Sequence, residues 1–234
     1  MTSSIKSIMN ENVLDKTVLV RADLNIPMSN GNISDQSRVE RVIPTINFLK
    51  SSGAKIVICS HLGRPNGKYN KNYTLKPLVE ILSNILETNV RFSNSCLGQE
   101  ALEIKTSLKA GEILLLENVR FHEEEINNSL SFAKKLSEGC DLFVNDAFSC
   151  SHRAHSSLHA ITNFLPSYSG KLMDEEIKAL TSVLSSPIKP VAALVGGAKI
   201  STKINIIEYL ITKMDYLIIG GAMANTFLVA EGLD

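Results

Sequence analysis

Polar and basic residues follow four short apolar segments of the chain, and their types suit the binding of a small anion. Arginine is the most informative, because its guanidinium group matches the oxygen geometry of phosphate and carboxylate groups. Acidic and amide side chains among them suit hydroxyl groups of the same ligand. The residues are Asp23 and Asn25 after the first segment, His61 and Arg64 after the second, Arg120 after the third, Arg153 after the fourth, and Arg38 at the start of the first helical segment.

Each of these residues also has an ordinary structural explanation. A single arginine or histidine in a loop is most often solvated or caps a helix, and Asp23 could simply cap a turn. Four such loops together are harder to explain in this way, because the expected fold places their ends side by side. The set therefore predicts one phosphate or carboxylate site.

The segment 196–203, with the sequence GGAKISTK, is a second candidate for contact with phosphate. Glycines let the backbone approach phosphate oxygens, the start of a helix offers free N–H groups, and Lys199 and Lys203 add positive charge. The chain has no GxGxxG motif, and segment 63–69 (GRPNGKY) has the wrong spacing and last residue for a Walker A motif. Taken alone, GGAK is more simply explained as a turn that leads into a helix.

The elements that must position these residues alternate between strands and helices. Strands are predicted from apolar, β-branched runs without polar alternation, which are typical of strands buried on both faces of a parallel sheet. They cover residues 17–21, 55–60, 112–117, 141–145, 191–195 and 216–219. Apolar side chains at helical spacing predict helices over residues 38–50, 75–86 and 171–184. The pattern predicts a doubly wound, Rossmann-like α/β sheet, which binds ligands beyond the carboxyl ends of its strands.

Three parts are predicted along the chain: an N-terminal domain over residues 1–170, a connecting helix over 171–186, and a second α/β domain over 187–234. The division follows a break near Gly170 and a proline-containing stretch that begins at Pro187. The second domain has only two predicted strands, and two strands do not make an independent sheet. We therefore expect this domain to be incomplete, with further sequence or a partner supplying the rest.

Charge and composition exclude several classes of protein. Lysine plus arginine and aspartate plus glutamate each number 24, so no net charge attracts nucleic acid or an anionic membrane. No apolar run is long enough to span a bilayer, and the N-terminal segment lacks the pattern of a secretion signal. With 44% hydrophobic and 21% charged residues, the chain is expected to fold throughout and to be cytoplasmic.

The cysteines are spread along the chain without a CxxC or Cys/His pattern, so we expect reduced thiols with structural roles. They are Cys59, Cys96, Cys140 and Cys150. Cys150 lies close in sequence to His152 and His155, which leaves a thiol nucleophile as an alternative. Sequence proximity alone, however, does not place a base on a thiolate.

Six segments, taken in order, resemble the signature motifs of the phosphoglycerate kinase family. They are RADLNIP at 21–27, HLGRP at 61–65, ENVRF at 117–121, HRAHSS at 152–157, GGAKISTK at 196–203 and GGAMANTF at 220–227. The resemblance covers the chain from residue 17 onward. It implies a reversible phosphoryl transfer between 1,3-bisphosphoglycerate and ADP, giving 3-phosphoglycerate and ATP with Mg²⁺ in glycolysis, by a monomeric, hinge-bending enzyme.

The resemblance also implies a role for particular residues. The acid substrate would be bound by Asp23, Leu24, Asn25, Arg38, His61, Leu62, Gly63, Arg64, Arg120 and Arg153. The nucleotide phosphates would be bound by Gly196, Gly197, Lys199 and Lys203. Arg38 and Lys199 would contact the transferred phosphoryl group as catalytic residues. No metal ligand is expected within the chain, because the family's magnesium-binding carboxylate corresponds to sequence beyond residue 234.

Family members extend well beyond this sequence, so we expect these 234 residues to bind 3-phosphoglycerate but to transfer phosphate poorly or not at all. Two other functions compete with this interpretation. One is a binding or regulatory fragment that uses the anion site without catalysis. The other is a dinucleotide-dependent oxidoreductase, against which the missing GxGxxG motif and the two lysines of segment 196–203 argue. A purely structural role would leave the arginines unexplained.

Overall fold

The chain forms two compact units, residues 1–176 and residues 177–234. The computed structural model describes residues 5–26, 28–29, 32–33, 35–185 and 187–233. Within these residues, no helix combines the length and the apolar composition needed to cross a lipid bilayer. The functional domains predicted at 1–170, 171–186 and 187–234 stay predictions, since compactness does not report what each part binds.

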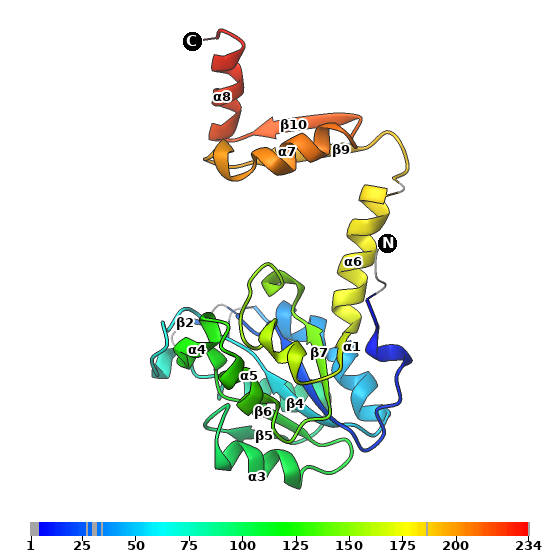
Figure 1. Cartoon of the computed structure of the whole chain (residues 1–234), viewed down its shortest axis with the longest axis vertical. Helices are drawn as coiled ribbons and strands as arrows, with labels where there is room; N and C mark the ends of the chain where they lie inside the picture. The colour runs from blue at the N-terminus through cyan, green and yellow to red at the C-terminus, as the bar shows by residue number, and fades with distance from the viewer. Residues whose placement is uncertain (1–4, 27, 30–31, 34, 186, 234) are drawn as a thin grey trace. The chain divides into compact units, whose positions relative to one another are not determined.

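A six-stranded parallel sheet forms the centre of the first unit (Figure 1). Its strands are β1 (Thr17–Ala22), β4 (Lys55–Cys59), β5 (Val90–Ser93), β6 (Ile113–Leu116), β7 (Leu142–Asp146) and β8 (Ser167–Ser169). Their spatial order is β5-β6-β4-β1-β7-β8. The chain thus winds to one side of β1 and then to the other, and a doubly wound sheet binds ligands beside such a reversal.

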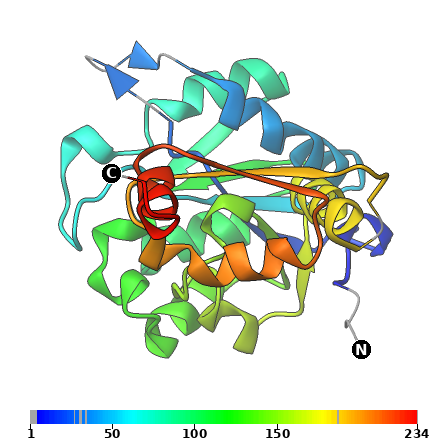
Figure 2. The same ribbon diagram turned by 90° about the horizontal axis from the view of Figure 1, so that it is seen from above.

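Helices cover both faces of this sheet. They are α1 (Ser37–Ser51), α2 (Leu78–Leu86), α3 (Gln99–Ser107), α4 (Glu123–Ile126) and α5 (Leu130–Ser137), and the small hairpin of β2 (Met28–Ser29) and β3 (Asn32–Ile33) precedes α1. Single 3₁₀ turns cover Ile8–Asn10, Lys71–Tyr73, Val119–Phe121, Phe148–Cys150 and Ala160–Asn163. In Figure 2 the blue α1 lies on one side of the sheet and the green α4 and α5 lie on the other.

Alternation along the strands explains the two core layers. Successive strand residues point to opposite faces, so Val18 and Val20 of β1 belong to the cluster that contains the apolar side of α1 and α2. Leu19 belongs to the opposite cluster, which contains apolar residues of α3 and α5. All six residues of β1 are buried, as expected for the central strand of a sheet covered on both faces.

The predicted fold class is confirmed, and every strand and helix predicted for the first unit is present. Helix α2 begins at Leu78 rather than at residue 75, because the Glu117 carboxylate accepts hydrogen bonds from the Thr74 hydroxyl and the Leu75 N–H and holds this segment outside the helix. Strands β5 and β8 were not predicted. Their sequences, VRFS and SYS, are short and half polar, since both strands lie at the edges of the sheet.

The second unit is built on two parallel strands, β9 (Ala192–Gly196) and β10 (Tyr216–Gly220). Its helices are α7 (Ile204–Ile211) and α8 (Ala222–Ala230), with a 3₁₀ turn at Ile200–Thr202. The core is small, formed around Val195, Ile207 and Met223. Leu194 and Ile218 point away from it and are exposed.

Helix α6 (Lys171–Ser185) starts in the first unit, where two carboxyl groups, buried Asp146 and half-buried Asp174, anchor its first turn. Asp146, at the end of β7, accepts a hydrogen bond from the Met173 N–H at 3.0 Å. Burial raises the pKa of Asp146 to about 6. Asp174 accepts hydrogen bonds from the Ser7 and Ser169 hydroxyl groups. Both carboxyl groups occupy the positive end of the helix dipole, so α6 has a fixed starting point on the sheet.

Gly170 makes this arrangement possible, because a Cβ atom there would lie 2.3 Å from Oδ1 of Asp146. We expect Gly170→Ala to lower the free energy of unfolding of the first unit by ~1–3 kcal/mol, the usual cost of overpacking. Urea denaturation followed by circular dichroism measures this change. The control is the same substitution in an Asp146→Ala background, where Oδ1 and Cγ, the two atoms nearest to the added Cβ, are absent, and there it should cost less. Equal losses in the two backgrounds would contradict the explanation.

Candidate functional site

The loops that follow β6, β4, β1 and β7 meet at one edge of the sheet, because these strands are consecutive neighbours. They enclose a pocket of about 260 Å³. Its walls are formed by Asp23, Asn25, Arg38, His61, Gly63, Arg64, Arg120, Ser149, Cys150, His152 and Arg153. The structure therefore brings together every side chain predicted to bind the acid substrate, apart from Leu24 and Leu62.

Leu24 and Leu62 are buried in the hydrophobic core and do not line the pocket. Their backbones position the loops instead. The Leu24 N–H donates to the Ser60 hydroxyl at 2.9 Å, and the Leu62 carbonyl accepts from the Asn118 amide at 2.8 Å. Any contact between these two residues and a ligand in the pocket would have to use the backbone.

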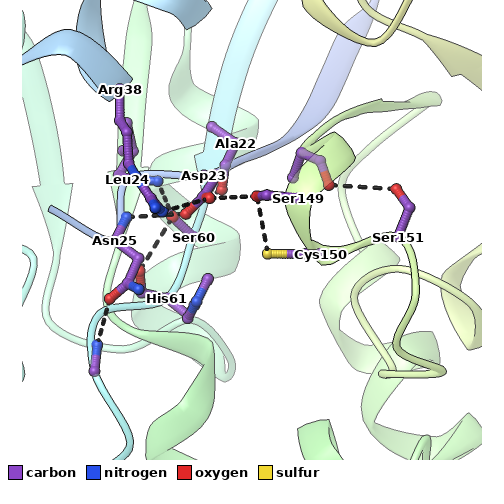
Figure 3. A network of polar contacts seen from close by, with 12 residues as sticks. Ala22, Asp23, Leu24, Asn25, Arg38, Ser60, His61, Ser149, Cys150 and Ser151 are labelled. Atoms are coloured by element: carbon purple, nitrogen blue, oxygen red, sulfur yellow. Dashed lines mark hydrogen bonds and ion pairs between the residues drawn. The ribbon is translucent and has the colours of Figure 1, made fainter. Parts of the chain in front are cut away.

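Asp23 and Arg38 form an ion pair on one wall of the pocket (Figure 3). Nη1 of Arg38 lies 2.8 Å from Oδ2 of Asp23, which also accepts a hydrogen bond from the Ser149 hydroxyl. Nearly half of the Arg38 side chain is exposed (48%), whereas the Asp23 side chain is 11% exposed. Such a solvated pair contributes little to stability, so Arg38 can exchange Asp23 for an anionic ligand at small cost.

Asn25, Gly63 and Arg120 connect three of the loops. The Gly63 N–H donates to Oδ1 of Asn25 at 2.8 Å, and the Gly63 carbonyl accepts from Nη1 of Arg120 at 2.9 Å. Gly63 has a φ of +62°, and a Cβ there would lie 2.4 Å from the Tyr73 ring. Glycine is therefore required at this position, and its backbone fixes Arg120 in the pocket wall.

Arg21, the fully buried last but one residue of β1, lies behind the pocket and ties its parts together. Its Nε donates to the Ser157 hydroxyl at 2.9 Å, and its Nη2 donates to Nδ1 of His61 at 3.1 Å. Ser157 in turn donates from its hydroxyl to Glu125 at 2.6 Å. Burial raises the pKa of Glu125, and the Arg21 charge opposes this rise. The buried cation thus has a nearby carboxyl group as compensation.

The contact with Arg21 determines the chemistry of His61. A guanidinium group only donates hydrogen bonds, so Nδ1 of His61 must accept and the single ring proton lies on Nε2. Burial lowers the pKa of His61 to about 2, with further lowering by the charges of Arg21 and Arg120. At neutral pH, His61 is therefore an uncharged N–H donor in the pocket rather than a cation.

Four guanidinium groups against one carboxylate make the pocket electropositive. Arg120 is 8% exposed, and within the residues that the structure describes its Nε has no hydrogen-bond partner. Burial lowers the pKa of Arg120, but an arginine remains charged in proteins. A neighbouring cavity of about 170 Å³ shares Arg64, Arg120 and Arg153 with the pocket. The arrangement suits a small ligand with more than one anionic group.

Asp23, His61 and Cys150 also place three potential metal ligands within 4.8 Å of one another. The donor set does not suit a cation. Metal-bound histidine normally donates its second ring N–H to an acceptor, whereas Nδ1 of His61 faces the donor Nη2 of Arg21. The surrounding guanidinium charges oppose a divalent ion as well.

His155 shares the buried environment behind the pocket. Its Nδ1 lies 3.8 Å from Oε1 of Glu125 and has no hydrogen-bond partner among the described residues. Burial lowers the pKa of His155 to about 4, assisted by the charges of Arg120 and Arg153. His155 is thus neutral at physiological pH, and neither His61 nor His155 adds positive charge to that of the arginines.

In the second unit, Gly196 is the last residue of β9, and Gly197, Lys199 and Lys203 follow it before α7. A Cβ at Gly197 would come within 3.2 Å of Cε of Lys203, and a Cβ at Gly221 within 3.3 Å of the Gly197 carbonyl. The Met223 N–H donates to that carbonyl at 2.9 Å. The loops after β9 and β10 therefore pack backbone to backbone, with Lys203 against the glycines and Lys199 exposed.

Sequence reasoning missed two groups of residues. Ser149 and Cys150 line the pocket, and their place between the fourth strand and the HRAHSS segment was the available signal. Arg21 and Glu125 lie behind it. An arginine inside an otherwise apolar strand was a signal for a buried charge, but nothing in the sequence pairs it with Glu125.

Comparison with known proteins gives a consistent result. The family model described as phosphoglycerate kinase matches residues 8–234. The curated phosphoglycerate kinases of Brucella melitensis and Bradyrhizobium diazoefficiens are each 47% identical, over 98% and 100% of this chain, and the chain spans 58% of the length of each. The solved phosphoglycerate kinase structure from Coxiella burnetii has a TM-score of 0.87 at 41% identity, covering 97% of this chain and 57% of its own. The one from Pyrococcus horikoshii has a TM-score of 0.86 at 36% identity, covering 98% and 58%.

Neutral, buried His61 makes stability depend on pH. Unfolding raises its pKa from about 2 towards about 6.5, so the unfolded state binds the additional proton and acid favours unfolding. We expect His61 to account for about 2 kcal/mol of the stability lost between pH 7 and pH 5. The variant His61→Gln keeps an acceptor for Arg21. Urea denaturation at the two pH values should show that it loses correspondingly less free energy of unfolding than the unaltered chain.

The control is His159→Gln, because His159 is exposed. It should lose as much stability as the unaltered chain between the two pH values. An unchanged pH dependence in His61→Gln would contradict the assignment of His61 as a buried, neutral group.

Proposed function

Because the chain belongs to the phosphoglycerate kinase family, we propose that its first unit binds 3-phosphoglycerate and 1,3-bisphosphoglycerate, and that its second unit binds the phosphates of ADP and ATP. The reaction is the reversible transfer of a phosphoryl group from 1,3-bisphosphoglycerate to ADP. Family membership supports the kinase activity and its place in glycolysis. The ligand roles of individual residues, the monomeric state, hinge bending and a cytoplasmic location are parts of the proposal.

The observation that carries the proposal is the electropositive pocket of the first unit. Arg38, Arg64, Arg120 and Arg153 offer donors to the carboxylate and phosphate groups of the acid. The Nε2 proton of His61 adds a neutral donor that does not depend on pH in the physiological range. Asp23 and Asn25 carry acceptors that suit a hydroxyl group of the ligand. Recognition of an unsubstituted phosphate would not require these two acceptors.

Arg38 is the proposed catalytic residue of this pocket. Its side chain is half exposed, and among the described residues its partner is Asp23, so it can turn towards a phosphoryl group by giving up one partly solvated ion pair. Catalysis of phosphoryl transfer rests on positioning and on stabilising charge on the transferred oxygens. A guanidinium group supplies both, and no covalent intermediate with the protein is needed.

For the nucleotide, Gly196 and Gly197 would admit phosphate oxygens to the backbone, and Lys203 would stand beside them. Lys199, which is exposed on the same loop, is the proposed second catalytic residue. Mg²⁺, which the family uses with ATP and ADP, would neutralise part of the nucleotide charge. The expectation that these 234 residues bind the acid but transfer phosphate poorly stays a prediction.

We expect the chain to bind 3-phosphoglycerate and Arg38→Ala to bind it about 10- to 100-fold more weakly, because a hydrogen bond to a charged group contributes about 1.5–3 kcal/mol. Isothermal titration calorimetry measures the dissociation constants. Arg41→Ala is the matched control: Arg41 lies one turn along α1 and pairs with Glu176 at 2.8 Å, outside the pocket. Equal affinity in the two variants would contradict the role of Arg38, and unfolding of Arg38→Ala would indicate a structural one.

The nucleotide part is tested by thermal unfolding with MgADP or with NAD. A ligand that binds the native state raises the melting temperature, so MgADP should raise that of the unaltered chain and NAD should not. Lys203→Ala should lose most of the MgADP effect. Stabilisation by NAD alone would favour a dinucleotide-dependent oxidoreductase, and binding of 3-phosphoglycerate without any MgADP effect would favour a binding fragment.

A further inference from the structure

Cys150 is a thiol in the wall of the anion pocket, and the proposed reaction does not use it. Its Sγ lies within 4.8 Å of a carboxylate oxygen of Asp23 and a ring nitrogen of His61. Its polar neighbour within hydrogen-bonding range is the Ser149 hydroxyl, at 3.7 Å (Figure 3). On its other side the residue packs against Ala147 and Leu158. The sulfur thus faces the pocket from a fixed position.

The surroundings of this sulfur attract anions. Arg38, Arg64 and Arg153 are exposed on the walls of the same pocket. Arg120 is more than nine-tenths buried and lines the pocket with an Nε that lacks a hydrogen-bond partner in the described part of the chain, so it has a donor left for a ligand. Arg120 and Cys150 line the same pocket, so the guanidinium group and the thiol can act on the same ligand.

Cys150 is itself buried, at 5% exposed, but it lines the pocket, which the other thiols of the chain do not. Cys59 and Cys96 are fully buried, and burial raises the pKa of both, that of Cys59 to about 12. Cys140 is half-buried, outside the pocket, and burial raises its pKa to about 11. Among the four cysteines, Cys150 alone combines contact with the pocket and nearby guanidinium groups.

We propose that Cys150 is a site of covalent modification by small electrophiles that carry a carboxylate or phosphate group, and that this modification closes the anion pocket. The guanidinium groups bind the anionic end of the reagent and hold its reactive carbon or sulfur near Sγ. A group attached to Sγ would then occupy a pocket of only about 260 Å³. That the attached group excludes 3-phosphoglycerate rests on the proposed function.

Iodoacetate is a suitable probe, because it carries the carboxylate that the arginines recognise. The thiolate of Cys150 attacks the methylene carbon, so a C–S bond forms, the C–I bond breaks and iodide leaves. The thiol proton goes to the solvent. Iodoacetamide reacts by the same steps without the negative charge, so the ratio of the two rates isolates the contribution of the arginines.

Peptide mass spectrometry of the native chain after timed labelling measures both rates at each cysteine. We expect the iodoacetate-to-iodoacetamide rate ratio at Cys150 to exceed that at Cys140 by about tenfold, within the range of electrostatic attraction in charged clefts, and to fall with added salt.

Arg64→Gln, at an exposed position, should lower the iodoacetate rate and leave the iodoacetamide rate unchanged. Cys150→Ser confirms the labelled peptide. Cys59 and Cys96 report unfolding, because they can react only when the core opens.

Equal ratios at Cys150 and Cys140, or no reaction at Cys150 before Cys59 and Cys96 are labelled, would overturn the proposal. Slower labelling of Cys150 in the presence of 3-phosphoglycerate would support closure of the pocket by the attached group. Loss of 3-phosphoglycerate binding by the carboxymethylated chain would support it as well. If calorimetry detects no 3-phosphoglycerate binding while the preference for iodoacetate persists, the proposed function fails and the modification site stands.

Discussion

The structure of the pocket depends on one buried charge, the guanidinium group of Arg21. It lies in the central strand and is fully buried, where an uncompensated charge would be very costly. The fold satisfies it by directing three partners at it: the Ser157 hydroxyl, the Ala22 carbonyl and Nδ1 of His61. These partners lie at the end of β1, directly after β4 and in the segment after β7. One side chain therefore fixes the relative positions of three loops.

The properties of the pocket follow from this constraint. His61 is held as a neutral donor, since it must accept from Arg21 and is too buried to take up a proton. Arg120 fixes the fourth loop through the Gly63 carbonyl. The rim arginines Arg38, Arg64 and Arg153 are exposed, so the pocket combines a buried, hydrogen-bonded floor with solvated charge at its rim.

Much of the site could be predicted, because it consists of loops after parallel strands and the strands are plain in the sequence. Strand adjacency was enough to bring Asp23, Arg64 and Arg153 together. The remainder depends on contacts between distant residues. Arg21 points inward because it donates to Ser157, 136 residues away in sequence. His61 is a neutral donor because it is buried beside Arg21, 40 residues away. Strands β5 and β8 were not predicted, because strands at the edge of a sheet are only partly buried and do not need a continuous run of apolar residues.

The Arg21 guanidinium holds His61 as a neutral imidazole with its proton on Nε2. Long-range ¹H–¹⁵N correlation spectra of the histidine rings, recorded across a pH titration, measure tautomer and protonation state directly. We expect His61 to keep the Nε2–H pattern without titrating near the ordinary histidine pKa of about 6.5. A proton on Nδ1, or titration of His61 near that ordinary value, would contradict it.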